Sequence, residues 1–149
     1  MEEKDLGCEV VTEFTYRLLM SKDCPLAGKK TITFQDLADY IEVAHADPYV
    51  PSLPVSKVMK EELPNNIDRR IFIFERASQY DLLAENPNTF MWVSPVPEKV
   101  QRRYGLVERF CEENQKVYCD VLIYRNSYTL TKLDKLFIEK LREVKAKYL

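Results

Sequence analysis

His45 is the single histidine of this sequence, so any nucleophilic chemistry that needs a histidine would depend on it. A Ser-His-Asp or Cys-His arrangement needs a histidine to activate its nucleophile, and the sequence holds no other. His45 also falls at the end of an expected helix, where a cationic or hydrogen-bonding side chain has a purely structural role. The structural role is the preferred interpretation, and no catalytic residue is assigned.

Cysteine and glycine usage excludes several kinds of site. No Cys-x-x-Cys pair is present, so no metal site is expected, and the thiols are interpreted as reduced, in an intracellular protein. Cys111 and Cys119 could form a disulfide across a hairpin, but buried free thiols are preferred. With three glycines, the sequence has no Gly-rich phosphate loop or dinucleotide turn, and no cofactor is expected. The four cysteines are Cys8, Cys24, Cys111 and Cys119.

Three pairs of basic residues could contact the phosphates of a nucleic acid. Each pair also precedes an apolar run, where flanking charges protect a protein from aggregation, and this second interpretation is preferred. The net charge of -2 gives no support to a general nucleic-acid-binding surface. The pairs are Lys29 and Lys30, Arg69 and Arg70, and Arg102 and Arg103.

The first part of the sequence predicts three helices. Residues 6–21 predict the first helix, because apolar side chains recur at steps of four. Residues 34–45 predict the second, which begins with Thr33 and Asp36 in a pattern similar to a capping box. After a proline-rich passage, residues 55–63 predict a short third helix.

The second part predicts a mixed arrangement of strands and helices. Apolar runs rich in β-branched and aromatic residues predict strands, and an apolar stripe that begins after Thr131 predicts a long amphipathic C-terminal helix. Residues 98–111 fit either a helix or a strand. The expected strands are residues 70–74, 89–93 and 117–124, and the helix between the first two is residues 75–85.

These elements together predict an α+β fold. It comprises a helical N-terminal part of three helices, a small mixed β-sheet of three or four strands, and the long amphipathic C-terminal helix. The expected division is a helical region at residues 1–63 and an α+β region at residues 64–149, either as separate parts or as one continuous domain.

One segment resembles a known family. Lys29-Lys30-Thr31-Ile32-Thr33-Phe34-Gln35-Asp36 joins a basic loop and a Thr-Ile-Thr step to the start of a helix, and an apolar periodic stretch precedes it. On these residues, the segment 8–41 resembles histone-fold subunits of the CBF/NF-Y and chromatin-accessibility-complex type. The resemblance implies an obligate partner subunit and contacts between DNA phosphates and Lys29 and Lys30. Three helices followed by strands also match the outline of a winged-helix domain.

The preferred function is a non-enzymatic protein-interaction or nucleic-acid-associated module that acts through a partner surface, in the cytoplasm or nucleus. Its amphipathic helices predict a protein partner or self-association, and nucleic acid is a further candidate partner. No apolar run approaches the roughly 20 residues of a membrane span, and no membrane association is expected. The alternative is a small enzyme or ligand-binding α+β domain with a pocket at the strand ends. The candidate residues of that pocket are Ser94, Asp120, Tyr124 and His45.

Overall fold

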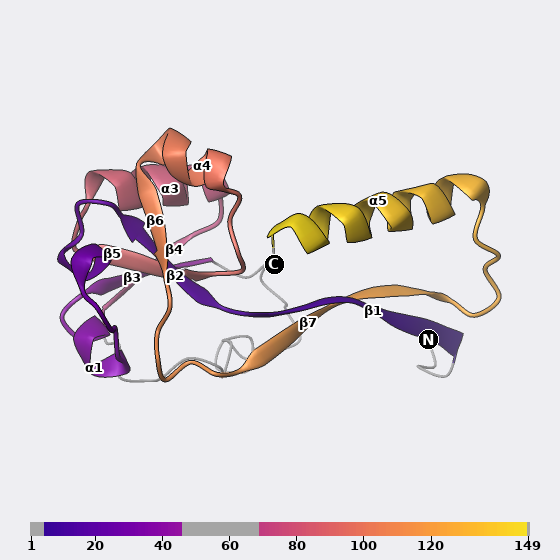
Figure 1. The fold of residues 1–149 in the computed structure, drawn as a ribbon, viewed down its shortest axis with the longest axis horizontal. Coiled ribbons are helices and arrows are strands. Elements are labelled where there is room, and N and C mark those ends of the chain that lie inside the picture. Colours follow the sequence, from indigo (N-terminus) through magenta and orange to yellow (C-terminus); the bar gives the residue numbers. More distant parts are fainter. Residues whose placement is uncertain (1–4, 46–68, 149) are drawn as a thin grey trace. The chain divides into compact units, whose positions relative to one another are not determined.

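The computed structural model describes residues 5–45 and 69–148, which belong to two compact units. The sheet unit is Arg17–Asn114. The ribbon unit combines Met1–Tyr16 with Gln115–Leu149. Because each unit has its own contacts, each is described by itself (Figure 1).

The sheet unit is built on a five-stranded sheet of order β4-β3-β5-β2-β6. β3 pairs in parallel with both β4 and β5, whereas β2 is antiparallel to both β5 and β6. Four strands therefore run in one direction and β2 alone runs in the other. The strands are β2 (Arg17–Ser21), β3 (Ile41–His45), β4 (Arg70–Ile73), β5 (Thr89–Val93) and β6 (Leu106–Arg109).

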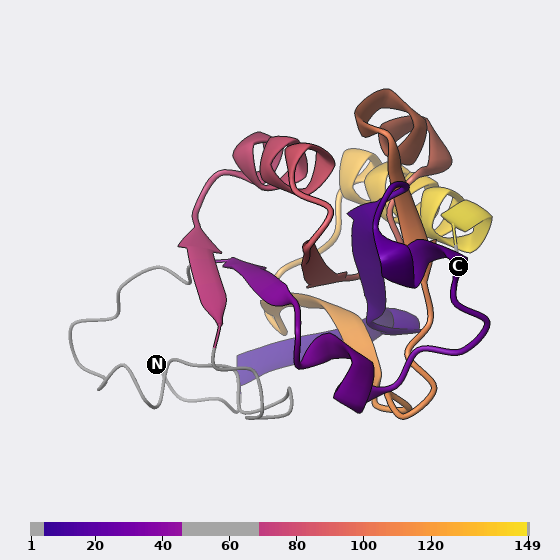
Figure 2. The ribbon, with the colours of Figure 1, turned by 90° about the vertical axis from the view of Figure 1, so that its left-hand side faces the viewer.

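Helices cover both faces of this sheet. The helices α3 and α4 lie on one side and α1 lies on the other (Figures 1 and 2). Gly105 ends α4 with a φ of 65°, the left-handed conformation that glycine adopts at helix ends. The helical elements are a 3-10 turn, η2 (Pro25–Gly28), and the α-helices α1 (Phe34–Leu37), α3 (Arg76–Glu85) and α4 (Glu98–Tyr104).

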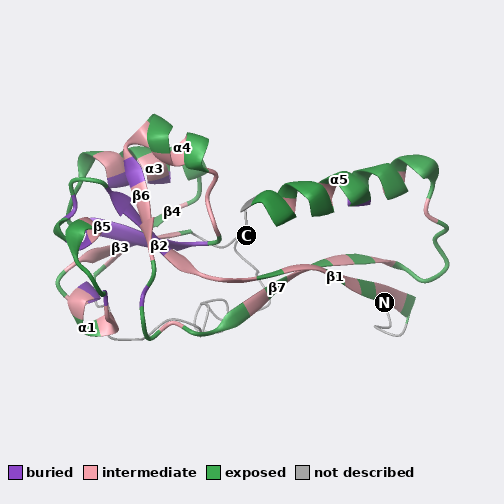
Figure 3. Ribbon diagram, viewed as in Figure 1, coloured by how far each residue is buried: buried purple, intermediate pink, exposed green. Residues whose placement is uncertain are grey.

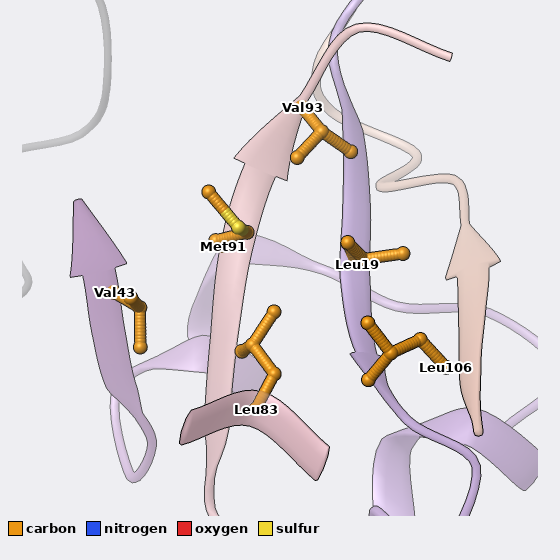
Figure 4. Close-up of a cluster of buried hydrophobic side chains, with 6 residues drawn as sticks. All are labelled: Leu19, Val43, Leu83, Met91, Val93 and Leu106. Atoms are coloured by element: carbon orange, nitrogen blue, oxygen red, sulfur yellow. The ribbon is translucent and has the colours of Figure 1, made fainter. Parts of the chain in front are cut away.

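Two apolar layers hold the sheet between these helices. Successive side chains of a strand point to opposite faces, so neighbouring core residues pack in different layers. On the α1 side, the ring of Trp92 contacts the rings of Phe34 and Phe90. On the α3 side, the buried cluster brings together side chains from four strands and one helix (Figure 4). Its members are Leu19, Val43, Leu83, Met91, Val93 and Leu106.

The ribbon unit consists of two long antiparallel strands and one helix. The strands β1 (Leu6–Thr15) and β7 (Val117–Arg125) pair with a bulge between Val10 and Thr12. The helix α5 (Lys132–Tyr148) is joined to this ribbon by ion pairs of Arg142 with Glu9 and of Lys145 with Asp120. Of the helices in the described residues, not one has the length and apolar character needed to span a lipid bilayer.

Much of the ribbon unit is exposed (Figure 3), and several of its exposed side chains are apolar. Ile138 of α5 is buried, but the predicted apolar stripe of this helix is largely exposed. Val10 and Val121, which lie opposite each other in the ribbon, are also exposed. The exposed side chains of α5 are Leu133, Leu136, Phe137 and Val144.

The predicted fold class, with three N-terminal helices before a small sheet, is wrong. Residues 6–21 form the strands β1 and β2. Their apolar side chains at Leu6, Val10, Phe14 and Leu18 recur every four positions, and positions four apart share a face of a strand as well as of a helix. β-branched and aromatic residues between them favour the strand.

The second predicted helix, residues 34–45, is also mostly wrong. Only one turn, α1, is helical, and the chain then enters β3. Glu42 and Val43 are both buried although they point to opposite faces of the sheet, as expected of a strand between two neighbours. The third predicted helix, residues 55–63, and the boundary between residues 63 and 64 lie outside the described residues.

The remaining elements are close to their predicted places. The structure confirms the strands β4, β5 and β7 and the helices α3 and α5. Residues 98–111 contain both predicted alternatives, the helix α4 and then the strand β6. β4 is an edge strand, however, so Ile71 and Phe72 are exposed rather than buried.

Carboxylates stabilise the starts of three helices. Asp36 accepts a hydrogen bond from the Thr33 N–H at 2.9 Å, and Asp134 accepts one from the Thr131 N–H at 2.8 Å. Glu75 accepts hydrogen bonds from the N–H groups of Ala77 and Ser78 at the start of α3. These groups would otherwise lack intrahelical partners. The pKa of each carboxyl is therefore lowered, in Glu75 mainly by Ser78 and in Asp36 mainly by Lys29.

Replacement of Leu83 by alanine should destabilise the protein strongly. Leu83 is 0% exposed, and the loss of a buried leucine side chain costs about 2–5 kcal/mol of unfolding free energy. Leu133, 74% exposed on α5, is the matched control, and Leu133→Ala should change stability by less than about 0.5 kcal/mol. Urea denaturation of both variants measures the difference, and equal effects would contradict the described core.

Replacement of Glu75 by glutamine should reduce the acid sensitivity of the protein. The pKa of Glu75 lies below its usual value of 4.5 in the folded state. Its contribution to stability is thus present above that value and is lost as the pH falls through the folded pKa. Melting temperatures from pH 7 to pH 3 should fall less steeply for Glu75→Gln than for the unmodified protein. Glu85→Gln, at the other end of α3, should keep the original slope; identical slopes for all three proteins would refute the capping role.

Candidate functional site

The carboxyl ends of β3 and β5 form a topological switch point in the sheet unit. After β3 the next strand, β4, lies on one side, and after β5 the next strand, β6, lies on the other. The two strands pair at Ile41 with Thr89 and at Glu42 with Phe90, near their amino ends. In open α/β sheets such a divergence of the chain leaves a crevice outside the carboxyl ends of the strands, where ligands bind.

Polar side chains flank this switch point. His45 is the last residue of β3 and is exposed, and Ser94 follows β5 directly and is exposed as well. Gln79, on α3, is 0% exposed and contacts His45 with its amide nitrogen 3.3 Å from the ring Nδ1. The same nitrogen donates a hydrogen bond to the Ile73 carbonyl at 2.7 Å. We call His45, Gln79 and Ser94 the switch-point cluster.

A partly buried ion pair fixes the loop that follows β5. Arg17 Nη1 lies 2.8 Å from Glu108 Oε2, and the other carboxylate oxygen of Glu108 accepts a hydrogen bond from the Val96 N–H. Gln101 donates to the Val96 carbonyl at 2.8 Å. Both backbone groups of Val96 are thereby held, so the loop that carries Ser94 is anchored from β6 and from α4.

The guanidinium of Arg17 also lies over the ring of Phe110, 4.9 Å from its centre, at the same edge of the sheet. Its Nε is buried without a hydrogen-bond partner. The ring, which is 64% exposed, thus covers a partly desolvated cation. This arrangement adds an aromatic surface to the edge where β2 begins and β6 ends.

The start of α3 does not offer its N–H groups to an external anion. The N–H groups of Ala77 and Ser78 lie 2.9 and 2.6 Å from the Glu75 carboxylate oxygens, and the Ser78 hydroxyl donates at 2.7 Å. A free helix N-terminus binds anions through such groups. Glu75 already supplies the negative charge at this helix start, so these donors are occupied within the protein.

The structure separates the four residues predicted for a pocket at the strand ends. It places His45 and Ser94 at the carboxyl edge of the sheet unit, but Asp120 and Tyr124 lie on β7 of the ribbon unit. Asp120 pairs with Lys145 there. Sequence reasoning missed Gln79. The sequence feature that could have indicated Gln79 is its position four residues before the buried Leu83, which places a polar side chain on the covered face of the helix.

The six basic residues lie on three separate segments of the sheet unit. Three of them form ion pairs: Lys29 with Asp36, Arg70 with Glu42, and Arg102 with Glu98. Of the others, Lys30 and Arg69 accept hydrogen bonds through their carbonyl groups, and Arg103 lies over the ring of Tyr104. Contact of these six residues with nucleic acid stays a prediction.

All four cysteines are free thiols. Cys24 and Cys111 are buried, and burial is the largest cause that raises the pKa of each. Cys119 lies on β7, in the other unit from Cys111, and is exposed. Within residues 5–45 and 69–148, no group of three or more metal-binding side chains comes together.

A surface groove lies in the ribbon unit. This groove has a volume of about 540 Å³ and lies beside α5 and β1. Charged residues of both signs line it, and two of them, Glu9 and Arg142, pair with each other. The lining residues are Glu9, Leu130, Lys135, Ile138, Glu139, Arg142 and Glu143.

Comparison with known proteins shows where this fold occurs. No protein-family model matches the chain, and no curated protein matches it either. Among solved structures, the effector-binding domain of QuiR in complex with shikimate has a TM-score of 0.63 and 17% identity, and the match covers 99% of this chain and 69% of that one. The regulatory domain of MetR, a LysR family regulator from N. meningitidis, has a TM-score of 0.66 and 14% identity, with coverage of 99% and 68%.

A third structure, the regulatory domain of Synechocystis CcmR in complex with 2-PG, has a TM-score of 0.64 and 17% identity, with coverage of 97% and 69%.

The expected resemblance of residues 8–41 to histone-fold subunits is therefore wrong, since the segment contains β1, β2 and β3. The preferred function, a module acting through a partner surface, is contradicted by these comparisons, which agree better with the alternative of a ligand-binding α+β domain. The chain has the α/β fold of the effector-binding domains of LysR family regulators.

Proposed function

We propose that this chain acts as a regulatory domain that binds a small-molecule effector at the switch-point cluster. The observation that carries the proposal is the pairing of exposed His45 with fully buried Gln79 where β3 and β5 diverge. This is the edge at which open α/β sheets bind ligands. The similarity to the effector-binding domains of QuiR and CcmR supports the same function.

The chemistry of the cluster favours a small, oxygen-rich ligand. The imidazole of His45 and the hydroxyl of Ser94 are both exposed and form hydrogen bonds readily with carboxylate, phosphate or hydroxyl oxygens. Shikimate is bound by QuiR and 2-PG by CcmR. We therefore assign small hydroxylated or phosphorylated acids as the class of effector to test first.

The proposal includes self-association and an intracellular location, as expected of a regulator. Leu133, Phe137 and Val144 are more than half exposed on one face of α5. Apolar side chains gathered in this way are typical of surfaces that bind another protein. These side chains support contact with a second copy of the chain or with another part of a regulator.

Calorimetric titration with shikimate and a panel of small hydroxylated and phosphorylated acids tests the proposal. At least one compound should bind, and His45→Ala and Ser94→Ala should each weaken its binding roughly tenfold, as expected for the loss of one hydrogen bond. Ser127→Ala, a change at an exposed serine of the ribbon unit, should leave the affinity unchanged. Binding that neither His45→Ala nor Ser94→Ala affects, or no binding across the panel, would contradict the assignment.

A further inference from the structure

The amide of Gln79 has only one orientation that suits its neighbours. The Ile73 carbonyl, 2.7 Å from Nε2, can accept a hydrogen bond but cannot donate one. The amide nitrogen must therefore face this carbonyl, since the opposite orientation would bring two oxygens together. β3 and β4 pair at His45 and Ile73, so the same nitrogen also lies within reach of the imidazole.

This orientation determines which ring nitrogen of His45 carries the hydrogen. The amide nitrogen has two hydrogens, one for the Ile73 carbonyl and one for Nδ1 of His45 at 3.3 Å. An Nδ1 that accepts a hydrogen bond holds no hydrogen itself. In the neutral ring the hydrogen then resides on Nε2, and the hydrogen bond at one nitrogen sets the role of the other.

The orientation also has an energetic cost. Oε1 of Gln79 is buried and has no hydrogen-bond partner within residues 5–45 and 69–148. A buried acceptor without a partner is unfavourable and is uncommon in folded proteins. The hydrogen bond to the Ile73 carbonyl and the contact with His45 thus position the nitrogen, and not the oxygen, of the amide.

We propose that Gln79 is a positioning residue that holds His45 in its Nε2–H form, so that His45 presents a hydrogen-bond donor to an acceptor oxygen of the effector. The role of the effector rests on the proposed function, whereas the form of the ring does not. Because Gln79 is 0% exposed and lies on a helix, it fixes both the direction of the ring and the hydrogen it offers. The inference assigns a carboxylate or another acceptor group to the part of the ligand that faces β3.

Nitrogen NMR of the full chain tests this directly, because His45 is the only histidine and gives a single set of ring signals. At pH 8.5, above the range in which histidines ordinarily protonate, the folded protein should show Nε2 protonated and Nδ1 unprotonated, with no second form. The same chain unfolded in urea provides the mixture of forms of an unconstrained ring. A folded protein with that mixture, or with Nδ1 protonated, would overturn the proposal.

Substitutions test whether Gln79 itself determines the form of the His45 ring. Gln79→Met, similar in size but unable to donate, should shift the ring to the mixture found in urea, and Gln79→Leu serves if the methionine variant does not fold. Gln101→Met is the control, because Gln101 also donates to a backbone carbonyl, at 2.8 Å, but lies on α4. An unchanged ring form in a folded Gln79 variant would overturn the proposal.

The affinity for shikimate tests the part of the proposal that concerns the effector. Gln79→Met should raise its dissociation constant roughly threefold to tenfold, because the donor of His45 is no longer held in place. If shikimate and the other acids fail to bind while the ring form depends on Gln79, the proposed function fails and the positioning role stands. If they bind with equal affinity to the protein and to Gln79→Met, the assignment of His45 as the donor to the effector is wrong.

Discussion

The parallel contact between β3 and β5 is the constraint on which the rest of the sheet unit depends. Their next strands, β4 and β6, lie on opposite sides, so the chain must leave this contact in opposite directions. Buried side chains on the α3 face, including Val43, Leu83 and Met91, pack across the contact and fix it (Figure 4). The divergence of the two strand ends follows from connectivity, and so does the place where a ligand can approach the sheet.

Internal hydrogen bonds occupy several of the polar groups around this edge. Glu75 accepts hydrogen bonds from N–H groups at the start of α3, and Glu108 accepts one from the N–H of Val96. Gln79 donates one to the carbonyl of Ile73. These contacts hold the loops after β4 and β5 in place. The side chains that stay exposed at the switch point, His45 and Ser94, are therefore presented from a fixed frame, which lowers the entropic cost of binding.

Only part of this arrangement could be predicted from the sequence. The helix at residues 75–85 and the strands at 70–74 and 89–93 carried clear local patterns, whereas the four-residue steps within residues 6–21 fit a helix and a strand equally well. Ser94 was a candidate because it follows a predicted strand, whereas His45 was a candidate although it was expected at the end of a helix. The contact of His45 with Gln79 depends on the parallel pairing of distant segments, which no local pattern reports. The histone-like interpretation failed because a basic loop and one helical turn occur in many folds.

Chemical-shift mapping with an isotope-labelled chain is the most direct test of the effector site. Shikimate, or the tightest binder of the acid panel, would be added in steps while the backbone amide and histidine signals are followed. The account predicts that the largest changes occur at His45, Ser94 and the residues around Gln79, with saturation at a single affinity. Changes concentrated instead on the groove beside α5, at residues such as Lys135 and Arg142, would contradict it.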